Sequence, residues 1–306
     1  MKRAPFVSAR WTERETGLGK EQLRKWRLRF GFPTVEATAD GQAAYSRGTV
    51  DQLVLIKRLL EAGFRPRQVV GRSAAELEAM KASLGLSAPL TRSDEATQAL
   101  IERLKRTDLT GFRTSLAEER AKRTMFDFVR ETLTPLLTGV GDSWARGEID
   151  IHHEHLCTCI IERYLHAEIL EFQPKDDLPS ILFAVPPGER HLLGLLMIEA
   201  VMAEQGVRTF NLGSDVPLDN LMGAAKSCQV DVVALSFSFA YPARDVVPVL
   251  RQLRRLLPPE IPIWAGGAGL SRVMTTRKGV RILSSLDEAV AALKSVPLQR
   301  AATHRP

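Results

Sequence analysis

The spacing of hydrophobic residues changes along the chain, and each spacing predicts a different kind of structure. Residues 1–72 contain short amphipathic helical patterns separated by Gly-containing turns. In residues 95–175 apolar side chains recur every three or four positions, which predicts a helical bundle. In residues 176–298 short apolar runs alternate with helical patterns, which predicts a mostly parallel sheet flanked by helices.

Two segments interrupt these patterns. Residues 73–94 mix Ser, Ala, Gly and charged residues around Pro89, and we expect a linker there. We expect residues 299–306 to form a disordered tail. Within the predicted bundle, one apolar face comprises Phe126, Val129, Leu133, Leu136, Val140 and Trp144.

The start of the chain predicts a helix, a turn and a second helix. "SARWTERETGLGKEQLRKWRLRFGFP" places the turn at residues 17–19 and the second helix at about Lys20 to Phe30. Leu23 and Trp26 share one face of this helix with Phe30 and would pack inward. The Arg and Lys side chains on the other faces suit the major groove of DNA, where Arg reads guanine and Lys neutralises phosphate. By itself, the pattern fits an ordinary amphipathic surface helix equally well.

The following residues extend this pattern to a known family. "TVEATADGQAAYS" predicts a two-stranded wing that turns at Asp40-Gly41, and "TVDQLVLIKRLLEAGFRPRQVV" predicts a helix pair. With "TGLGKEQLRKWRLRFGFP", "DGQAAYS" and "LVLIKRLLEAGF", residues 5–72 resemble the winged DNA-binding domain of MerR-type regulators. The resemblance implies contacts with double-stranded operator DNA by Lys20, Gln22, Arg24, Lys25, Arg27, Arg29 and Tyr45. At Ala43 MerR wings usually carry an arginine, so one phosphate contact is expected to be missing.

The distribution of charge agrees with a DNA-binding first segment. The 306-residue chain has a net charge of +6. Residues 1–70 contain 14 Lys and Arg against 7 Asp and Glu, whereas the remainder contains 28 against 29. The basic surplus therefore lies entirely in the first segment, as expected if only that segment meets a polyanion.

The bulk composition excludes several other classes of protein. No apolar run approaches the roughly 18–20 residues that span a bilayer, so we expect no membrane segment. The start "MKRAPFVSARW" lacks the apolar centre of a secretory signal. Cys157, Cys159 and Cys228 make neither a disulfide framework nor zinc-ligand spacing. We therefore expect a cytoplasmic protein with reduced thiols.

The candidate chemistry lies in the loops of the third region. "PPGERHLLG", "LGSDVP", "SFSF" and "GGAG" each follow a predicted strand. In a doubly wound fold such loops meet at the carboxyl edge of the sheet, where ligands bind. The first loop lacks both the G-x-G-x-x-G of dinucleotide folds and the Gly-Lys-Ser/Thr of P-loops, and the third strand lacks the terminal Asp of a response regulator.

The residue types in these loops point instead to a ligand that carries a metal. His191 can offer a neutral imidazole nitrogen to a metal, while Glu189 accepts a hydrogen bond from the other ring nitrogen. Gly194 leaves room for a flat, bulky ring near the backbone. The neighbouring strand ends add Ser236, Ser238, Gly266 and Gly267.

Glu-x-His-x-x-Gly, Ser-x-Ser and Gly-Gly, each at the tip of the proper strand, resemble the base-off/His-on cobalamin-binding domain. The resemblance implies that His191 is the lower axial ligand of the cobalt and that the other residues of these motifs bind the cofactor. Glu189 and Ser238 depart from it, because the family usually has Asp and then Ser-x-Leu or Ser-x-Thr. The expected fold is an α-rich winged helix-turn-helix, a helical bundle and a doubly wound, flavodoxin-like (Rossmann-type) α/β domain.

The predicted bundle carries a third motif. Trp144 is followed, after nine residues, by Glu154-His155, the Trp-x9-Glu-His signature of CarH/LitR-type photoreceptor regulators. The resemblance implies a helical cap in which Trp144, Ile151, Glu154 and His155 contact the adenosyl group or its surroundings. It further implies a repressor, not an enzyme, that adenosylcobalamin assembles in the dark into a DNA-binding homo-oligomer, a dimer of dimers. Light breaks the cobalt–carbon bond in that family, and the tetramer falls apart.

One residue departs from that family. Photoreceptor members carry a His directly after the Trp, and it ligates cobalt from above after photolysis, whereas this chain has Ala145. His152 and His153 lie nearby in sequence, but with His155 they do not converge as an i, i+4 metal pair does. The sequence leaves open a regulator that ignores light and responds to methylcobalamin, hydroxocobalamin or redox state. A corrinoid methyl carrier is a further alternative, but it needs no basic, winged-helix-like first segment.

Overall fold

The computed structural model describes residues 6–16, 18–37, 43–61, 64–83, 95–145, 148–238, 241–270 and 278–296. The chain divides into two compact units. The first comprises residues 1–109 and 135–155, and the second comprises residues 110–134 and 156–306. The helices of the predicted bundle are distributed over both units. In the part of the chain that is described, no helix is both long enough and apolar enough to cross a membrane.

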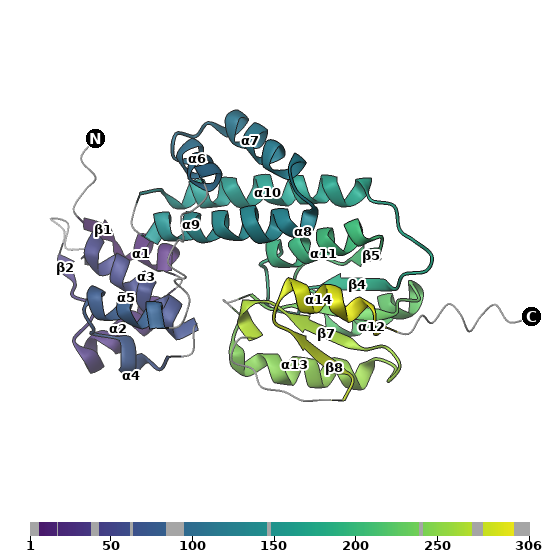
Figure 1. Cartoon of the computed structure of the whole chain (residues 1–306). Coiled ribbons are helices and arrows are strands. Elements are labelled where there is room, and N and C mark those ends of the chain that lie inside the picture. The colour runs from purple at the N-terminus through teal and green to yellow at the C-terminus, as the bar shows by residue number, and fades with distance from the viewer. Residues whose placement is uncertain are drawn as a thin grey trace, which may run out of the picture. The chain divides into compact units, whose positions relative to one another are not determined.

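The first unit begins with a winged helix-turn-helix. Its elements are β1 (Phe6–Ser8), α1 (Ala9–Thr16), α2 (Lys20–Phe30), β2 (Glu36–Ala37), β3 (Ala43–Ser46), α3 (Arg47–Glu61), α4 (Pro66–Val69) and α5 (Ala74–Ser83). The three strands form an antiparallel sheet in the order β1-β3-β2 (Figure 1). The predicted helix-turn-helix is confirmed, while the predicted turn at Asp40-Gly41 lies outside the described residues.

One apolar core holds these helices together. Leu23 and Trp26 of α2 are 2% and 5% exposed and share the core with the apolar face of α3. α2 ends at Phe30, and Gly31 follows with a φ of 71°, the left-handed conformation typical of the residue after a helix. Leu77 belongs to the same core and is fully buried. Residues 74–83, which we expected in the linker, therefore form the helix α5.

The remainder of the first unit consists of helices from the predicted bundle. These are α6 (Glu95–Lys105), α9 (Thr134–Ala145) and the first residues of α10 (Ile151–Glu171). α6 and α9 approach closely at Gly139, because a Cβ there would lie 2.6 Å from Cδ1 of Ile101. Lys105 Nζ lies 3.0 Å from carboxylate oxygens of both Glu102 and Glu148. This pair of contacts links the end of α6 to the segment that precedes α10.

α9 continues without a break from α8 (Met125–Phe128) through a π-helical turn, η1 (Val129–Leu133). The hydroxyl of Thr134 donates to the carbonyl of Val129 at 2.8 Å, five residues earlier. Four of the six residues of the predicted apolar face, Val129, Leu133, Leu136 and Val140, are at most 2% exposed, while Phe126 and Trp144 at its two ends are half-buried. The three-to-four spacing thus identified the buried side of these helices correctly.

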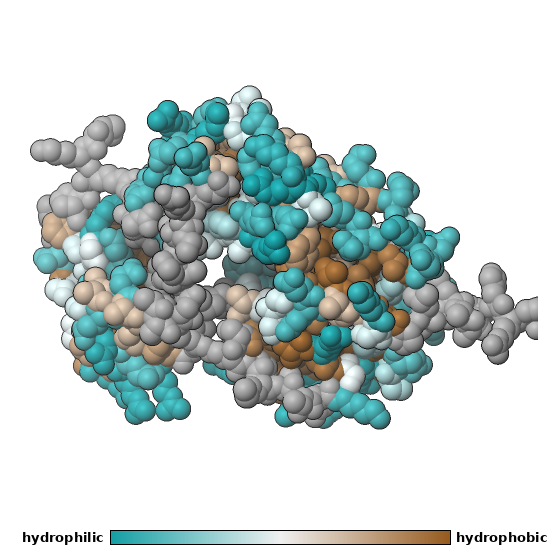
Figure 2. Space-filling model, in the orientation of Figure 1, coloured by the Kyte–Doolittle hydropathy of each residue, from teal (hydrophilic) through white to brown (hydrophobic). Residues whose placement is uncertain are grey.

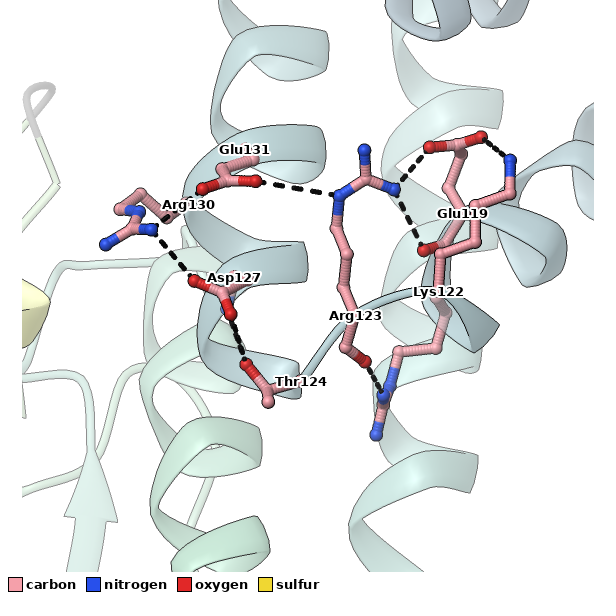
Figure 3. A network of polar contacts seen from close by, with 8 residues as sticks. Glu119, Lys122, Arg123, Thr124, Asp127, Arg130 and Glu131 are labelled. Atoms are coloured by element: carbon pink, nitrogen blue, oxygen red, sulfur yellow. Dashed lines mark hydrogen bonds and ion pairs between the residues drawn. The ribbon is translucent and has the colours of Figure 1, made fainter.

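In the second unit, a network of charged side chains joins α7 (Leu109–Ala121) to α8 and η1 (Figure 3). Arg123 contacts Glu119 at 2.5 Å and Glu131 at 3.7 Å. Arg130 contacts Glu131 at 2.7 Å and Asp127 at 2.8 Å. The connected chain of contacts fixes the short segment between α7 and α8 at both ends.

Arg120 connects the same region to two further helices. Its Nε lies 2.9 Å from Glu168 of α10, and its Nη2 lies 3.1 Å from Glu204 of α11 (Leu193–Gln205). Glu204 also accepts the backbone N–H of Met125 at 2.7 to 2.8 Å, which satisfies a donor at the start of α8. Since the Arg120 side chain is 16% exposed, these ion pairs are less screened than surface pairs.

The second unit also contains a five-stranded, all-parallel sheet (Figure 1). Its strands are β4 (Ser180–Ala184), β5 (Arg208–Asn211), β6 (Val232–Ser236), β7 (Ile263–Gly266) and β8 (Val280–Leu283). The helices beside it are α11, α12 (Leu218–Ser227), α13 (Ala243–Leu256) and α14 (Leu286–Leu293), and a short 3-10 turn, η2 (Ala268–Leu270), follows β7. The order β5-β4-β6-β7-β8 is that of flavodoxin-like folds, which confirms the predicted doubly wound domain.

Successive residues of each strand face two different cores. One core contains Leu182, Val233 and Ile263 together with side chains of α12 and α13. The other contains Phe183 and Trp264 together with side chains of α11 and α14. The helices therefore cover both faces of the sheet, and hydrophobic residues gather on the face that shows α11 and α14 (Figure 2).

Candidate functional site

The candidate site lies where the order of strands reverses. β4 and β6 are neighbours in the sheet, although β5 lies between them in the sequence. After β4 the chain passes to α11 on one face, and after β6 it passes to α13 on the other. The two loops diverge, and such a point is the usual ligand site of a doubly wound fold. The loop after β4 carries Glu189 and His191, and Ser238 follows β6.

The buried carboxylate of Glu189 holds this site together through hydrogen bonds. Its side chain is 2% exposed. Oε1 accepts the backbone N–H groups of Arg190 and His191 at 2.8 and 2.9 Å, and it lies 2.7 Å from Nδ1 of the His191 ring. Oε2 accepts the backbone N–H of Ser238 at 2.9 Å. The two carboxylate oxygens therefore join the loop after β4 to the end of β6.

The contact with Glu189 decides which ring nitrogen of His191 carries the proton. An ionised carboxylate only accepts hydrogen bonds, so Nδ1 donates and Nε2 carries the lone pair of the neutral ring. Ser238 Oγ lies 3.2 Å from the same Nδ1. The His191 side chain is 63% exposed, so an oriented ring projects from a buried anchor. A metal-ligating imidazole needs this arrangement.

The hydrogen bonds keep Glu189 ionised in spite of its burial. Burial by itself would raise the pKa of this carboxyl group, but the hydrogen bonds from His191 and Ser238 outweigh it and lower the pKa to about 2. The carboxylate is therefore charged throughout the neutral range of pH. A charged acceptor on Nδ1 increases the electron density that Nε2 offers to a metal.

A cavity of about 650 Å³ opens beside His191. It lies between the sheet, α11 and α14, with Phe183 and Trp264 contributing from the sheet and Ala289 from α14. Six of the residues singled out in the sequence line it: His191, Gly194, Ser236, Ser238, Gly266 and Gly267. The structure thus brings the three sequence motifs of this domain together around one space.

Glycine occupies positions 194 and 267 of the site for different reasons. A Cβ at Gly194 would meet only Ser236 Oγ, at 3.6 Å, which is ordinary van der Waals contact. A Cβ at Gly267 would overlap the carbonyl oxygen of Phe237, and the backbone there has a φ of 101°. The fold itself therefore requires glycine at 267. At 194 it does not, so the space left there is available to a ligand.

Sequence reasoning did not single out Gly269, although it is part of the "GGAG" loop. A Cβ at this position would overlap the carbonyl oxygen of Ser238, and the Gly269 N–H donates to the carbonyl of Phe237 at 3.0 Å. The motif contained a signal for a close approach, but its partners, Phe237 and Ser238, follow β6 and lie 32 and 31 residues earlier in the sequence. Trp264 lines the cavity and is 4% exposed, but no motif in the sequence indicated it.

The predicted cap residues lie in the first unit, around the connection between α9 and α10. Trp144 is half-buried near the end of α9, and Ile151 is the first residue of α10. Glu154 and His155 follow at the start of α10, with Glu154 Oε2 3.0 Å from His155 Nδ1. The signature therefore spans the end of one helix and the beginning of the next.

The histidines near this connection form a cluster different from the one considered in the sequence. Ligand atoms of Asp150, His152 and His153 lie within 4.8 Å of one another, and the two rings have centroids 3.9 Å apart. However, His153 Nδ1 already accepts the backbone N–H of Asp150 at 3.1 Å. The start of a helix also repels cations. This geometry favours a helix cap over a metal site, and His155 pairs with Glu154 instead.

The polar faces of α2 are available to a large partner. The residues predicted to contact DNA from this helix are all exposed: Lys20, Gln22, Arg24, Lys25, Arg27 and Arg29. Tyr45 differs, because it is 6% exposed and packs in the core of the winged helix-turn-helix. Little of its side chain can therefore reach a ligand directly. Leu28, which the sequence analysis did not single out, is 73% exposed on the same helix.

Three protein-family models match successive parts of the chain. The model described as MerR HTH family regulatory protein matches residues 11–73. Two models described as B12 binding domain match residues 96–167 and residues 179–293. The predicted MerR-type and cobalamin-binding resemblances are confirmed, and DNA and cobalamin are the binding partners that these domains imply.

Two curated relatives come from Myxococcus xanthus. The HTH-type transcriptional repressor CarH is 29% identical over 256 residues, which cover 82% of this chain and 85% of CarH. The HTH-type transcriptional repressor CarA is 27% identical over 304 residues, which cover 96% of this chain and 97% of CarA. Both are named as repressors, which agrees with the prediction of a regulator rather than an enzyme.

A solved structure shares the fold of about two thirds of the chain. The monomethylamine corrinoid protein of Methanosarcina barkeri superposes with a TM-score of 0.53 and 17% identity. The match covers 66% of this chain and 99% of that protein. At this identity the likeness establishes a shared fold and nothing about function.

Proposed function

Because the chain joins a MerR-type helix-turn-helix to B12-binding domains and is homologous to the repressors CarH and CarA, we propose that adenosylcobalamin controls its binding to operator DNA. In this proposal, the protein with bound cofactor forms a homo-oligomer, a dimer of dimers, in the dark. The oligomer occupies its operator in the cytoplasm and represses transcription. Illumination dissociates the oligomer and releases the DNA.

The observation that carries this proposal is the anchored ring of His191. Its Nδ1 is held by a buried, ionised Glu189, and its side chain is 63% exposed beside a cavity of about 650 Å³. His191 would bind the cobalt of a corrinoid through Nε2, and the cavity beside the ring would receive part of the cofactor. The donor set and the space therefore fit cobalamin in its base-off/His-on form.

When bound, adenosylcobalamin supplies a cobalt–carbon bond that visible light breaks. The residues of this chain supply the rest of the switch. His191, held by Glu189, would bind the cobalt, and we propose that Trp144, Ile151, Glu154 and His155 bind the adenosyl group. In this proposal, side chains at the connection between α9 and α10 would respond to the loss of that group.

The switch needs no change in the DNA-contacting helix itself. A ligand that favours the oligomer drives assembly in proportion to its different affinities for the two states. Several basic α2 helices on one assembly raise the effective affinity for DNA by roughly 10²- to 10⁴-fold over a single one. When the oligomer dissociates, the protein therefore no longer binds the operator tightly, while each α2 helix keeps its own weak affinity for DNA.

The full-length protein tests this proposal directly. We would load it with adenosylcobalamin in the dark, then measure its mass by gel filtration and its binding to promoter DNA by mobility shift, before and after green light. The proposal expects a tetramer that binds DNA in the dark and a smaller, non-binding species after illumination. A mass and a DNA affinity that are independent of both cofactor and light would contradict it.

Ala145 favours a second candidate function, in which the cofactor acts without light. The photoreceptor family has a histidine at this position, and this chain has no side chain there that can ligate a metal. In this alternative, cobalamin still drives assembly, but illumination leaves the complex with DNA intact. Methylcobalamin and hydroxocobalamin, tested beside adenosylcobalamin in the same gel-filtration experiment, distinguish this function from the first.

Gly194→Val should weaken cobalamin binding without destabilising the protein. The fold has room for a side chain at 194, where a Cβ meets only Ser236 Oγ at 3.6 Å, but that side chain would occupy the ligand's space. We expect the dissociation constant to rise about tenfold or more, which is the effect of forced overpacking. Absorbance titration with cobalamin measures it, and the unfolding midpoint of the cofactor-free protein should stay nearly unchanged.

Gly223→Val is the matched control for this variant. Gly223 is an exposed helical glycine with nothing within 4 Å of an added Cβ. The Gly223→Val variant should bind cobalamin with the affinity of the unchanged protein. If Gly194→Val binds equally well, the space at 194 does not belong to the cofactor site.

A further inference from the structure

The exposed surface of α2 carries one acidic side chain among its basic ones. Glu21 lies in the first turn of the helix, and its side chain is 68% exposed. Five of the expected DNA contacts on this helix are cations: Lys20, Arg24, Lys25, Arg27 and Arg29. An acid on a surface that approaches phosphates weakens the general attraction to DNA. We therefore expect a contact of Glu21 that offsets this loss of attraction.

That contact is with Arg24. Arg24 Nη2 lies 3.0 Å from Glu21 Oε2, and Nε lies 3.1 and 3.3 Å from the two carboxylate oxygens. The hydrogen bond and charge of Arg24 lower the pKa of Glu21. Glu21 thus holds the side edge of the guanidinium, formed by Nε and one N–H of Nη2. Among the described residues, the structure gives Nη1 no partner.

The remaining edge of this guanidinium matches a guanine. Arginine has five N–H donors in a fixed plane, so the two donors at its end, on Nη1 and Nη2, remain when the side edge is occupied. Two parallel donors of this kind bind O6 and N7 of guanine in the major groove. Glu21 and Arg24 lie in the N-terminal half of α2, the part of a recognition helix that enters the groove. They lie opposite the buried side of the helix that carries Leu23 and Trp26.

We propose that Glu21 is a positioning residue that holds the Arg24 guanidinium for end-on recognition of one guanine in the operator. This inference rests on the proposed DNA-binding function. It assigns selectivity at one base pair to an acidic residue, although the surrounding cations supply most of the affinity. Fixing the guanidinium before binding lowers the entropy that Arg24 loses on contact with the base.

Glu21→Gln tests the proposal because Glu21 has two possible effects on DNA binding. Loss of its charge should raise the affinity for every duplex, whereas loss of its contact with Arg24 should lower the preference for one base pair. We would first select a DNA site from a random duplex pool with the full chain, with and without adenosylcobalamin in the dark. The affinities of the variant are then measured for this site, for each of its single-base-pair changes, and for an unrelated duplex. We expect affinity for the unrelated duplex to rise, because a negative charge is lost. The ratio of specific to unrelated binding should fall roughly tenfold.

The pattern of the loss identifies its cause. Arg24→Ala should lose preference at the same G·C pair, and the double variant should lose no more than Arg24→Ala alone. Glu76→Gln is the control, because it breaks a similarly exposed pair with Arg72 on a helix other than α2. It should leave the ratio unchanged.

Four results would overturn the proposal. One is an equal rise in affinity for all duplexes with Glu21→Gln, which means that Glu21 contributes only its charge. Another is a loss at one base pair that persists without Arg24, which means that Glu21 reads a base itself. If the unchanged protein selects no DNA site under either condition, the proposed function fails and takes this inference with it. Specific binding that ignores both variants contradicts the inference alone.

Discussion

His191→Ala should lower the affinity for cobalamin roughly 100-fold or more, because the variant removes the only ligand that we assign to the protein side of the cobalt. The red absorption bands of protein-bound cobalamin should change to those of the cofactor with its own base or water below the metal. Equilibrium dialysis measures the affinity, and the visible spectrum reports the axial ligand. Cofactor-driven assembly should disappear in the same variant.

The fold should survive this change. The ring of His191 is 63% exposed and its removal leaves the backbone bonds of Glu189 to residues 190 and 238 in place. His166→Ala, at another exposed histidine of the second unit, is the matched control and should bind cobalamin normally. Unchanged affinity and colour in His191→Ala would refute the cofactor site and the regulatory proposal that depends on it.

Gly267→Ala should destabilise the cofactor-free protein by about 3 kcal/mol or more, and little folded protein should accumulate. The added Cβ would overlap the carbonyl oxygen of Phe237 and lie 3.1 Å from its carbonyl carbon and amide nitrogen. The backbone φ of 101° is a further cost for any residue with a side chain. All three contacted atoms belong to the backbone of Phe237, directly after β6, so a side-chain rotation cannot relieve the clash. Urea unfolding without cofactor measures the loss.

Gly188→Ala separates the two costs. Gly188 also has a positive φ, 81°, but nothing lies within 4 Å of an added Cβ. We expect it to lose about 1 kcal/mol, which is the conformational cost alone. If Gly267→Ala loses no more than Gly188→Ala, the ends of β6 and β7 are not as tightly packed as the structure indicates.

Much of the fold could be predicted because its patterns are local. The three-to-four spacing of Val129, Leu133, Leu136 and Val140 depends only on the geometry of a helix, and these residues are buried as expected. The alternation of strands and helices after residue 179 specified the doubly wound domain for a similar reason. The π-helical turn was not predicted, because one extra residue per turn hardly changes that spacing.

Long-range packing decided what local patterns could not. The polar composition of residues 73–94 predicted a linker. Residues 74–83 instead form a helix, because Leu77 packs into the same apolar core as residues of α3. Tyr45 was expected to touch DNA, and the same core buries it to 6% exposure. In both cases packing against the core of the winged helix-turn-helix decides how far the side chain is exposed.

The sequence by itself determined the types of chemistry at the site and the order of the elements that carry it. His191, Gly194 and the paired residues at 236, 238, 266 and 267 were identified from motifs, because each motif is a short run with a defined place after a strand. Only the tertiary structure decided how they act together. The reversal of strand order places Ser238 beside Glu189, although they are 49 residues apart. The backbone N–H of Ser238 donates to one oxygen of the Glu189 carboxylate, and the other oxygen holds the His191 ring in one tautomer. That contact exists because parallel strands bring distant loops to one edge, which no local pattern records.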